Sequence, residues 1–284
     1  MKNDYRNAVY ENIWDTRSLP CAWFMDYSVF PAHFHSSFEF TYQIKGETHV
    51  ILDGQPYVLK PGEMLLVSGS IVHAGTSSPG SDSYVMIIPL PAVPYLQSAL
   101  SGKVFKRPIM EKCSVTKDAV DCMKKVIPYL DMLDRPDSYS PYKTYISSAL
   151  LKGYAYTFFS LLIKEVGLCD LQSSKTSLLA QDILNYLQAN YLEPITLDTL
   201  CNEFGYSRSS FSHIFNNYFG CSLTKYLNIL RCLHFNDIFN DQSDLDIADA
   251  ALDCGFGSVR SFYRAYRDLY GHSPRQDDSA DVSD

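Results

Sequence analysis

The sequence predicts an α+β chain that begins with a β-barrel and ends with an all-α domain. Short apolar strands separated by turn residues fill the stretch from about 20 to 112, whereas helical periodicity runs from about 115 to 166 and from 178 to 276. The chain has 284 residues, more than one typical core, so several domains are expected. The predicted boundaries are a barrel over 1–112, a helical packing segment over 113–166, a linker over 167–177, a helical domain over 178–276 and a disordered acidic tail over 277–284.

The strands of the predicted barrel are punctuated by glycine and proline. Asp53-Gly54 is a strong hairpin signal, because both residues accept a positive φ angle. Several short strands at regular spacing are typical of a barrel or sandwich. Examples of the expected strands are Phe38–Ile44, Thr48–Leu52, Tyr57–Leu59, Met64–Val67 and Ser83–Ile88.

The segment Tyr142–Glu165 is predicted to be a helix that is apolar around much of its circumference. Such a helix has to be covered by other apolar surface. Two covers are open: a second subunit, which would make this a dimerisation helix and is the favoured interpretation, or the barrel of the same chain. The short polar stretch 167–177 that follows is interpreted as the linker between domains.

Composition argues against several classes of protein. The sequence has no run of 18 apolar residues and no apolar signal core at its polar N-terminus, so we expect no membrane partner and a cytoplasmic location. The eight cysteines include no Cys-x-x-Cys pair and no zinc-finger spacing. Free thiols are the favoured interpretation, and redox sensing is the alternative.

Charge is unevenly divided along the chain. Residues 1–177 carry 17 basic and 17 acidic residues, whereas residues 178–284 carry 7 basic and 15 acidic residues, which places the whole net charge of −8 in the C-terminal part. An acidic domain binds DNA only if its few cations lie on the DNA-facing surface.

The helical domain contains a helix, a glycine turn and a capped second helix. Gly205 ends the first helix, because glycine adopts the left-handed conformation cheaply, and Ser207 caps the second. Both helices place apolar residues at i, i+3, i+4 and i+7. The two faces are Leu197, Leu200, Cys201 and Phe204, then Phe211, Ile214, Phe215 and Tyr218.

The same pattern recurs about 50 residues later. Gly255-Phe256-Gly257 forms the turn, and Ser258 is the cap. A single helical hairpin is weak evidence, but two copies at matched spacing are typical of a double helix-turn-helix domain. The second pair of faces is Ile247, Ala250, Ala251 and Cys254, then Phe262, Ala265, Tyr266 and Leu269.

The polar stripe opposite each apolar face supplies the candidate DNA-contacting residues. These side chains donate or accept hydrogen bonds with base edges and phosphates, and the arginines add positive charge. A solvated arginine stripe without a partner is the alternative. The candidates are Arg208, Ser209, Ser212, His213 and Asn216 in the first unit, and Ser258, Arg260, Ser261, Arg264 and Arg267 in the second.

Several of these motifs resemble the AraC/XylS family of transcription regulators. They are Phe204–Phe215, Gly220–Leu227, Ile247–Ala251 and Gly271–Pro274. The resemblance covers roughly 180–275. It implies two helix-turn-helix units joined by a long helix, here about Leu223–Phe239, with recognition helices that enter successive major-groove segments. The sequence departs from the family at Asn216 and Asn217, where basic residues are common, and at Phe235, a usually small position.

The barrel segment resembles the cupins. His33, His35 and Glu39 have the spacing of the first cupin motif, and His73 follows Gly62 with the spacing of the second. In cupin enzymes the corresponding residues bind a divalent metal, and imidazole and carboxylate suit such ions. The favoured interpretation is that the same four residues line a polar effector pocket without metal, because Ser68 and Ser70 replace the usual proline and glycine of the second motif, and metal binding is the alternative.

Other barrel side chains extend the predicted effector pocket. Tyr42 and Trp23 are added to the four residues, because aromatic rings can stack on a sugar, and packing in the barrel core is the more common alternative for such rings. The family's frequent link with carbohydrates favours a sugar or sugar derivative as the effector.

Together these features predict a sequence-specific regulator of transcription rather than an enzyme. The expected partners are double-stranded DNA, a small-molecule effector in the barrel and a second copy of the chain in a homodimer. No cofactor is expected, with a divalent metal held by His33, His35, Glu39 and His73 as the alternative. The competing function is a metal-dependent cupin enzyme with a helical appendage.

Overall fold

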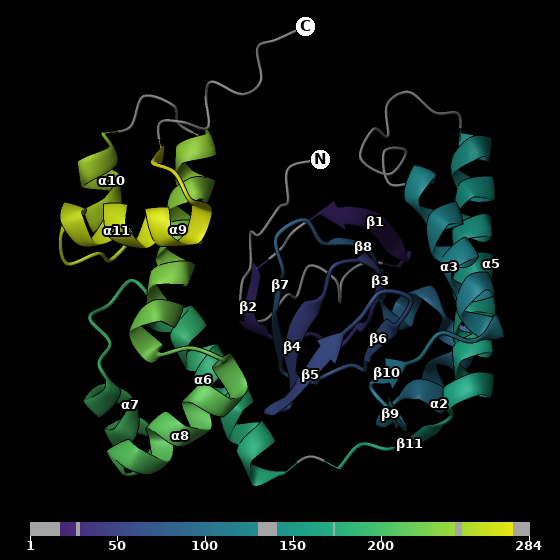
Figure 1. The fold of residues 1–284 in the computed structure, drawn as a ribbon, viewed down its shortest axis with the longest axis horizontal. Coiled ribbons are helices and arrows are strands. Elements are labelled where there is room, and N and C mark those ends of the chain that lie inside the picture. The colour runs from purple at the N-terminus through teal and green to yellow at the C-terminus, as the bar shows by residue number, and fades with distance from the viewer. Residues whose placement is uncertain (1–17, 27–28, 130–140, 173, 242–245, 275–284) are drawn as a thin grey trace, which may run out of the picture.

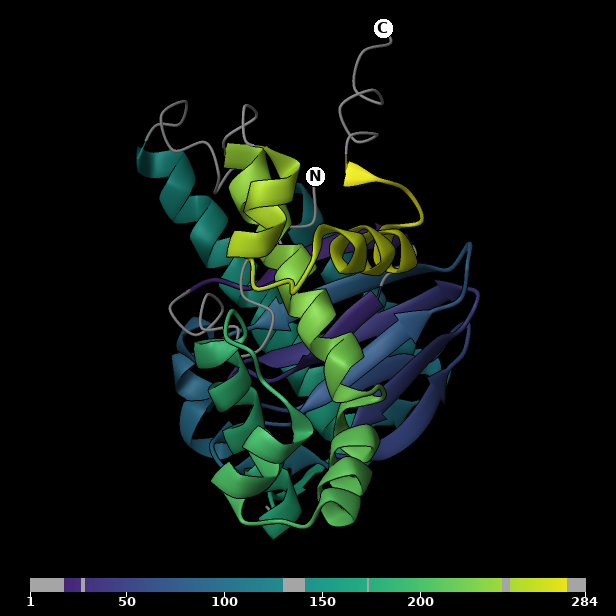
Figure 2. The same cartoon turned by 90° about the vertical axis from the view of Figure 1, so that its left-hand side faces the viewer.

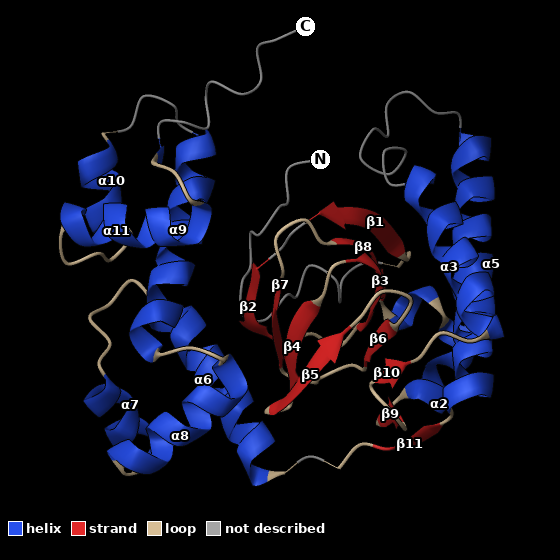
Figure 3. Ribbon diagram, in the orientation of Figure 1, coloured by secondary structure: helices blue, strands red, loops and turns tan. Residues whose placement is uncertain are grey.

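The computed structural model describes residues 18–26, 29–129, 141–172, 174–241 and 246–274. It confirms the predicted α+β fold, since two antiparallel sheets come first and a group of helices comes last (Figures 1 and 3). The predicted acidic tail 277–284 lies outside the described residues.

The barrel consists of two antiparallel sheets with the strand orders β1-β8-β3-β6-β10 and β2-β7-β4-β5. Val50 and Leu52 of one sheet share an apolar cluster with Leu65 and Val67 of the other, so the two sheets pack face to face. The strands are β1 Cys21–Asp26, β2 Val29–His33, β3 Phe38–Lys45, β4 Thr48–Leu52, β5 Gln55–Leu59, β6 Met64–Val67, β7 His73–Ser77, β8 Asp82–Ile88 and β10 Ile109–Met110.

The predicted hairpin at Asp53-Gly54 is confirmed. Leu52 pairs with Gln55 across the turn, and φ is 47° at Asp53 and 76° at Gly54. The turn therefore fixes the register of β4 and β5, which directs Val50 and Leu52 toward the barrel interior.

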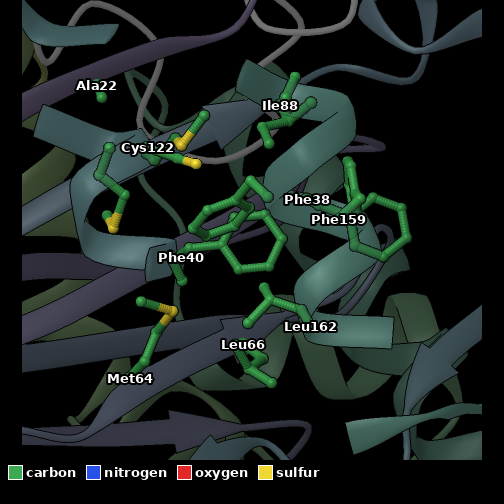
Figure 4. Packing of buried hydrophobic residues seen from close by; sticks show 14 of the residues in the cluster. Ala22, Phe38, Phe40, Met64, Leu66, Ile88, Cys122, Phe159 and Leu162 are labelled. Carbon is green, nitrogen blue, oxygen red and sulfur yellow. The ribbon is translucent and has the colours of Figure 1, made fainter. Parts of the chain in front are cut away.

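A helical layer covers the outer face of the five-stranded sheet. Phe40 lies 4.7 Å from Phe158 and Phe38 lies 5.2 Å from Phe159, measured between ring centroids. Figure 4 shows Phe38, Phe40 and Phe159 within this core. These edge-to-face pairs bury both strand and helix in one core. The helices and 3-10 turns of this part are η1 Leu90–Ala92, η2 Pro94–Leu96, α2 Gln97–Leu100, α3 Ser114–Val126, η3 Ile127–Tyr129 and α5 Pro141–Val166.

The long helix α5 is thus covered on one side by the barrel of its own chain. This was the alternative to coverage by a second subunit. Residues Ile146–Val166 are long and apolar enough to cross a membrane by length and composition alone. In the structure, Phe158, Phe159 and Leu162 of this stretch are fully buried in the protein core, whereas Ile146 and Leu150 are exposed.

The predicted linker 167–177 is not entirely irregular. Its first part forms β11 (Leu168–Asp170), which pairs with β9 (Lys103–Phe105), and its end enters α6 after the cap at Ser174. The free part of the connection is therefore shorter than the sequence predicted, because backbone pairing holds its first half to the barrel domain.

The C-terminal helices begin and end where the sequence predicted their caps. The Ser207 and Ser258 side chains accept hydrogen bonds from the third helical residue, and Gly205 ends its helix with φ at 72°. The helices are α6 Lys175–Asn190, α7 Leu197–Phe204, α8 Arg208–Phe219, α9 Leu223–Asp241, α10 Ile247–Asp253 and α11 Val259–Tyr270. We call α7 and α8 the first helix-turn-helix unit, and α10 and α11 the second.

The two units have different surroundings, and Figure 2 shows α9 connecting them. The first unit shares its core with barrel residues Ala32, Phe34, Val72 and Ala74. Among the described residues, the core of the second unit contains only side chains from α9, α10, α11 and the turns beside them. The first unit is therefore docked on the barrel through a continuous apolar core.

Candidate functional site

The structure brings the four residues of the cupin-like pattern together between the two sheets. His33 ends β2, His35 lies in the following loop, Glu39 belongs to β3 and His73 begins β7. One ligand atom from each of the four lies within 4.8 Å of the others. A bulge between Phe30 and His33 disrupts the β2–β7 register, and His33 pairs directly with His73.

Each histidine is held by a backbone carbonyl. The Nδ1 atoms of His33, His35 and His73 lie 2.8, 2.9 and 2.8 Å from the carbonyl oxygens of Pro31, Ser37 and Ile71. Because a carbonyl only accepts, each Nδ1 donates, and the Nε2 atom of the neutral ring carries a lone pair. This is the arrangement that orients histidine ligands in metal sites.

Glu39 supplies the negative charge of the site. Its Oε2 atom lies 3.3 Å from His35 Nε2 and 3.6 Å from His73 Nε2. Burial raises the pKa of Glu39, but the hydrogen bond with His35, the 3.6 Å contact with His73 and the charge of either ring when it is protonated outweigh burial and hold that pKa well below its usual range. The carboxylate is therefore ionised at neutral pH and accepts hydrogen bonds only.

Because the cluster is buried, its carboxylate and nitrogen lone pairs raise the free energy of the folded state unless a cation lies between them. The three histidines are buried, and the Glu39 side chain is 12% exposed. Among the described residues, His73 Nε2 is buried without a hydrogen-bond partner. A lone pair that faces a carboxylate is unfavourable unless a proton or a metal ion lies between them. The donor set, the carbonyl anchors and the unpaired His73 nitrogen fit a divalent metal ion.

The two predicted aromatic residues lie on opposite faces of the five-stranded sheet. Trp23 packs beside Cys21 and Ile87, and Ile87 pairs with Glu39, so Trp23 faces the barrel interior. Tyr42 is three residues from Glu39 and packs in the core under the helical layer. The structure therefore brings Trp23, but not Tyr42, to the interior side where the effector was predicted.

A groove of about 490 Å³ lies between the barrel and the first helix-turn-helix unit. It is mostly apolar, with one lysine. Its lining includes Phe30, Ile51 and Ala74 from the barrel and Phe219, Cys221 and Lys225 from the other side. Since Phe30 and Ala74 are close neighbours of His33 and His73 in the chain, the groove lies just outside the histidine cluster.

The first unit presents a mostly uncharged polar face. Ser209, His213 and Asn216 are exposed on α8, whereas Ser212 is half-buried. Arg208 begins this helix and is exposed, but its guanidinium pairs with both carboxylate oxygens of Asp198 on α7. The single cation predicted on this face is therefore already paired.

The second unit presents a cationic face. Arg260, Arg264 and Arg267 are exposed on α11, while Phe262, Ala265 and Tyr266 are buried on the opposite side. Within the described part of the chain, no ion pair involves these three arginines. Ser258 is exposed and serves as the cap, and Ser261 is half-buried beside it.

The residues that join the two domains were not predicted from the sequence. The Tyr226 hydroxyl donates to the Ala32 carbonyl at 2.6 Å, the Gln181 amide donates to the Ser70 carbonyl at 2.7 Å, and the Ser177 hydroxyl donates to Asp53 at 2.9 Å. No local pattern could have identified these pairs, since their partners lie more than 100 positions apart in the chain.

Two family models match the chain. The AraC-like ligand binding domain matches residues 22–121, and a helix-turn-helix domain matches residues 200–278. The fold and the matched regions thus define a ligand-binding barrel joined to a helix-turn-helix domain.

Relatives of known sequence are also regulators of transcription. The probable transcription factor PqrA of Proteus vulgaris is 33% identical over 95 residues, which are 33% of this chain and 77% of PqrA. The regulator ExsA of Pseudomonas aeruginosa is 26% identical over 256 residues, covering 83% of this chain and 87% of ExsA. The chain belongs to the AraC family of transcriptional regulators.

Other comparisons are more limited. The regulator GbdR of Pseudomonas aeruginosa is 33% identical over 97 residues, which are 34% of this chain but only 26% of GbdR, so the chain spans about a quarter of that relative. ToxT of Vibrio cholerae overlaps 90% of this chain and 96% of its own, with 15% identity and a TM-score of 0.46. GbdR and ExsA are named as transcriptional regulators and PqrA as a probable transcription factor, so none of these three supports the alternative of a cupin enzyme.

Proposed function

We propose that the chain is a cytoplasmic, homodimeric transcription factor that binds specific double-stranded DNA through both helix-turn-helix units. The observation that carries the proposal is the repeated exposure of a hydrogen-bonding helix face opposite a largely buried apolar face, on α8 and on α11. Exposed hydroxyls, amides and guanidinium groups on such helices read base edges and phosphates.

The charge distribution supports this use of the two faces. The domain is acidic overall, yet Arg260, Arg264 and Arg267 are exposed on one helix. Phosphate attraction depends on cations at the contact rather than on net charge, and it weakens as salt is added. We therefore assign most of the affinity for phosphates to the arginines of α11, and most of the recognition of bases by uncharged polar groups to α8.

The N-terminal barrel is the proposed sensor of a small-molecule effector. His33, His35, Glu39 and His73 form its polar centre, and Trp23 faces the same interior. The preference for a sugar stays a prediction, supported by one interior aromatic ring rather than two, because Tyr42 packs under the helices. An effector there acts on the first unit, which is docked on the barrel.

The proposed homodimer rests on α5. One side of this helix is buried against the barrel, but Ile146 is 45% exposed and Leu150 is 40% exposed near its start. Two such side chains on one exposed helix face form the apolar centre that a second copy of the same helix would cover.

The test is selection of duplexes from a random DNA library with the full-length chain, followed by titration of the selected duplex and a scrambled duplex. We expect the selected duplex to bind at least about a thousandfold more tightly. His73→Ala should keep this DNA binding but change the response to candidate sugars. Equal affinity for both duplexes would refute sequence-specific DNA binding, and an unchanged dose-response in His73→Ala would refute the pocket.

A further inference from the structure

The contacts that join the two domains lie beside the histidine cluster. Tyr226, at the start of α9, donates to the carbonyl of Ala32, which directly precedes His33. The hydroxyl oxygen and the carbonyl oxygen are 2.6 Å apart, and both residues are fully buried. A shift of His33 would therefore move the Ala32 carbonyl, and the buried Tyr226 hydroxyl would lose its hydrogen-bond acceptor.

A second connection starts at His35. The Ser70 amide donates to the His35 carbonyl at 2.7 Å, and the Ser70 carbonyl accepts from Gln181 of α6, also at 2.7 Å. Ser70 has a positive φ of 66°, which is costly for a residue other than glycine. Its peptide unit is therefore held in place on both sides, by His35 and by Gln181.

A third connection starts next to His73. The Asp53 amide donates to the Val72 carbonyl at 2.8 Å, and the Asp53 carboxylate accepts from Ser177 of α6 at 2.9 Å. Each of the three histidines is thus linked to the DNA-binding domain by one or two hydrogen bonds through its own or an adjacent carbonyl.

Strand alternation provides an apolar connection as well. Ala32 and Phe34 flank His33, and Val72 and Ala74 flank His73. Side chains of adjacent residues in a strand point to opposite faces, so the histidines face inward while their four neighbours face the first helix-turn-helix unit. All four neighbours belong to the core cluster of that unit, together with Phe215 of α8.

We propose that His33, His35, Glu39 and His73 bind a divalent transition-metal ion, and that this ion is a signal that controls docking of the first helix-turn-helix unit on β2 and β7. The inference rests on the proposed function, since it names the ligand class and the regulatory route of the same sensor. Three imidazoles and one carboxylate suit first-row divalent ions, and no cysteine lies within this cluster.

The direction of the effect follows from the docked state. In this arrangement the four ligand atoms already lie within 4.8 Å of one another, and their rings are held by carbonyl groups. A ligand favours the conformation that binds it better, so the metal favours the docked conformation. By linkage, docking must raise the metal affinity by the same factor.

Docking leaves the DNA-facing side of α8 open. Ser209, His213 and Asn216 are exposed while Phe219, at the end of the same helix, is buried on the barrel side. The metal would therefore set the position of the first unit relative to the barrel rather than cover its recognition face.

Cys221 offers a direct readout of docking. It lines the groove between the barrel and the first unit, and burial raises the pKa of its thiol to about 11. Undocking exposes this thiol and returns its pKa toward the ordinary value, which increases the reactive thiolate fraction. Cys169 on β11 is exposed in the barrel domain and serves as the internal reference.

The experiment uses untagged, full-length protein stripped with chelator, and Ni²⁺ as the probe. Metal bound after dialysis is counted, and alkylation rates at Cys221 and Cys169 are measured by peptide mass spectrometry with and without Ni²⁺. We expect one Ni²⁺ per chain and Cys221 alkylation slowed at least about threefold, with Cys169 unchanged. Glu39→Gln should weaken Ni²⁺ binding at least about tenfold and abolish the protection of Cys221.

His35→Ala is the second variant in case Glu39→Gln does not fold, and it should give the same result. Failure of the wild-type chain to retain Ni²⁺ overturns the metal site. Retention of Ni²⁺ with an unchanged Cys221 rate overturns the control of docking. DNA binding of the metal-free chain is titrated separately. If the metal-free chain binds its DNA specifically but Ni²⁺ does not change Cys221 alkylation, this inference is refuted and the proposed function stands.

Discussion

The two helix-turn-helix units have the same local design and different surroundings. Each consists of a short helix, a turn and a serine-capped second helix. The first unit shares its core with the barrel and has its arginine paired, whereas the second has a core of its own and three exposed arginines. The local pattern builds the hairpin, and tertiary contacts decide how each copy is used.

The difference suggests a division of labour. Because its core includes barrel side chains, the first unit can respond to the sensor. Since the second unit shows no barrel side chain in its core among the described residues, it can supply phosphate affinity whatever the state of the sensor. Four predictions test this comparison, starting with the largest expected effect.

Phe262→Ala should damage the second unit alone. The ring is fully buried among Phe235, Phe256 and Tyr266, and removing such a ring costs about 3–5 kcal/mol. Hydrogen exchange should rise across residues 247–270 and stay unchanged in the first unit and the barrel. In the comparison variant Phe215→Ala, hydrogen exchange should rise in β2 and β7 as well as in α7 and α8. A rise confined to α7 and α8 would contradict the core that the first unit shares with the barrel.

Arg264→Ala should weaken binding to the selected DNA by about 1–3 kcal/mol if the guanidinium reads a base. The arginine is exposed on α11, opposite the buried Ala265 and Tyr266, so the protein should stay folded. Lys117→Ala removes an exposed cation from α3 in the barrel domain and is the control for net charge. Equal losses in both variants would show that Arg264 has no specific role.

Tyr226→Phe should destabilise the docked arrangement by about 1–3 kcal/mol, because the buried carbonyl of Ala32 loses its donor. Urea unfolding of the full chain measures the change in the free energy of unfolding. Tyr206→Phe alters an exposed tyrosine of the first unit and should have no measurable effect. If both variants matched the wild type, the hydrogen bond would not contribute to docking.

Arg208→Ala should reduce DNA affinity less than Arg264→Ala does, because Arg208 must leave Asp198 before it contacts a phosphate. The pair also lowers the pKa of Asp198 through the hydrogen bond with Arg208, so the carboxylate stays ionised and keeps competing. Asp198→Asn should slightly strengthen DNA binding at low salt. A larger loss of DNA affinity in Arg208→Ala than in Arg264→Ala would contradict the assignment of most of the phosphate affinity to the second unit.

Much of the fold could be predicted from local patterns. The periods of 2 and 3.6 residues located β4 and the paired helices, because each of these elements buries one face. The caps at Ser207 and Ser258 and the turn at Asp53 were predictable because they depend on neighbouring residues only. The cluster of His33, His35, Glu39 and His73 was expected from the resemblance to the two cupin motifs.

The contacts between domains could not be predicted in this way. Tyr226 and Ala32 are 194 positions apart, and nothing near either residue in the sequence indicates that they meet. Tyr42 was misplaced for a simpler reason: an odd separation from Glu39 on one strand puts the two side chains on opposite faces. The strand β11 was missed because its residues lie in a polar stretch that was interpreted as linker.

The most direct test of the account is hydroxyl-radical footprinting of the full-length chain on its selected duplex. Two protected segments about 10 base pairs apart are expected, one for α8 and one for α11. Arg264→Ala should weaken one segment, and His213→Ala should weaken the other. A single protected segment, or two segments that respond identically to both substitutions, would contradict the use of both units on DNA.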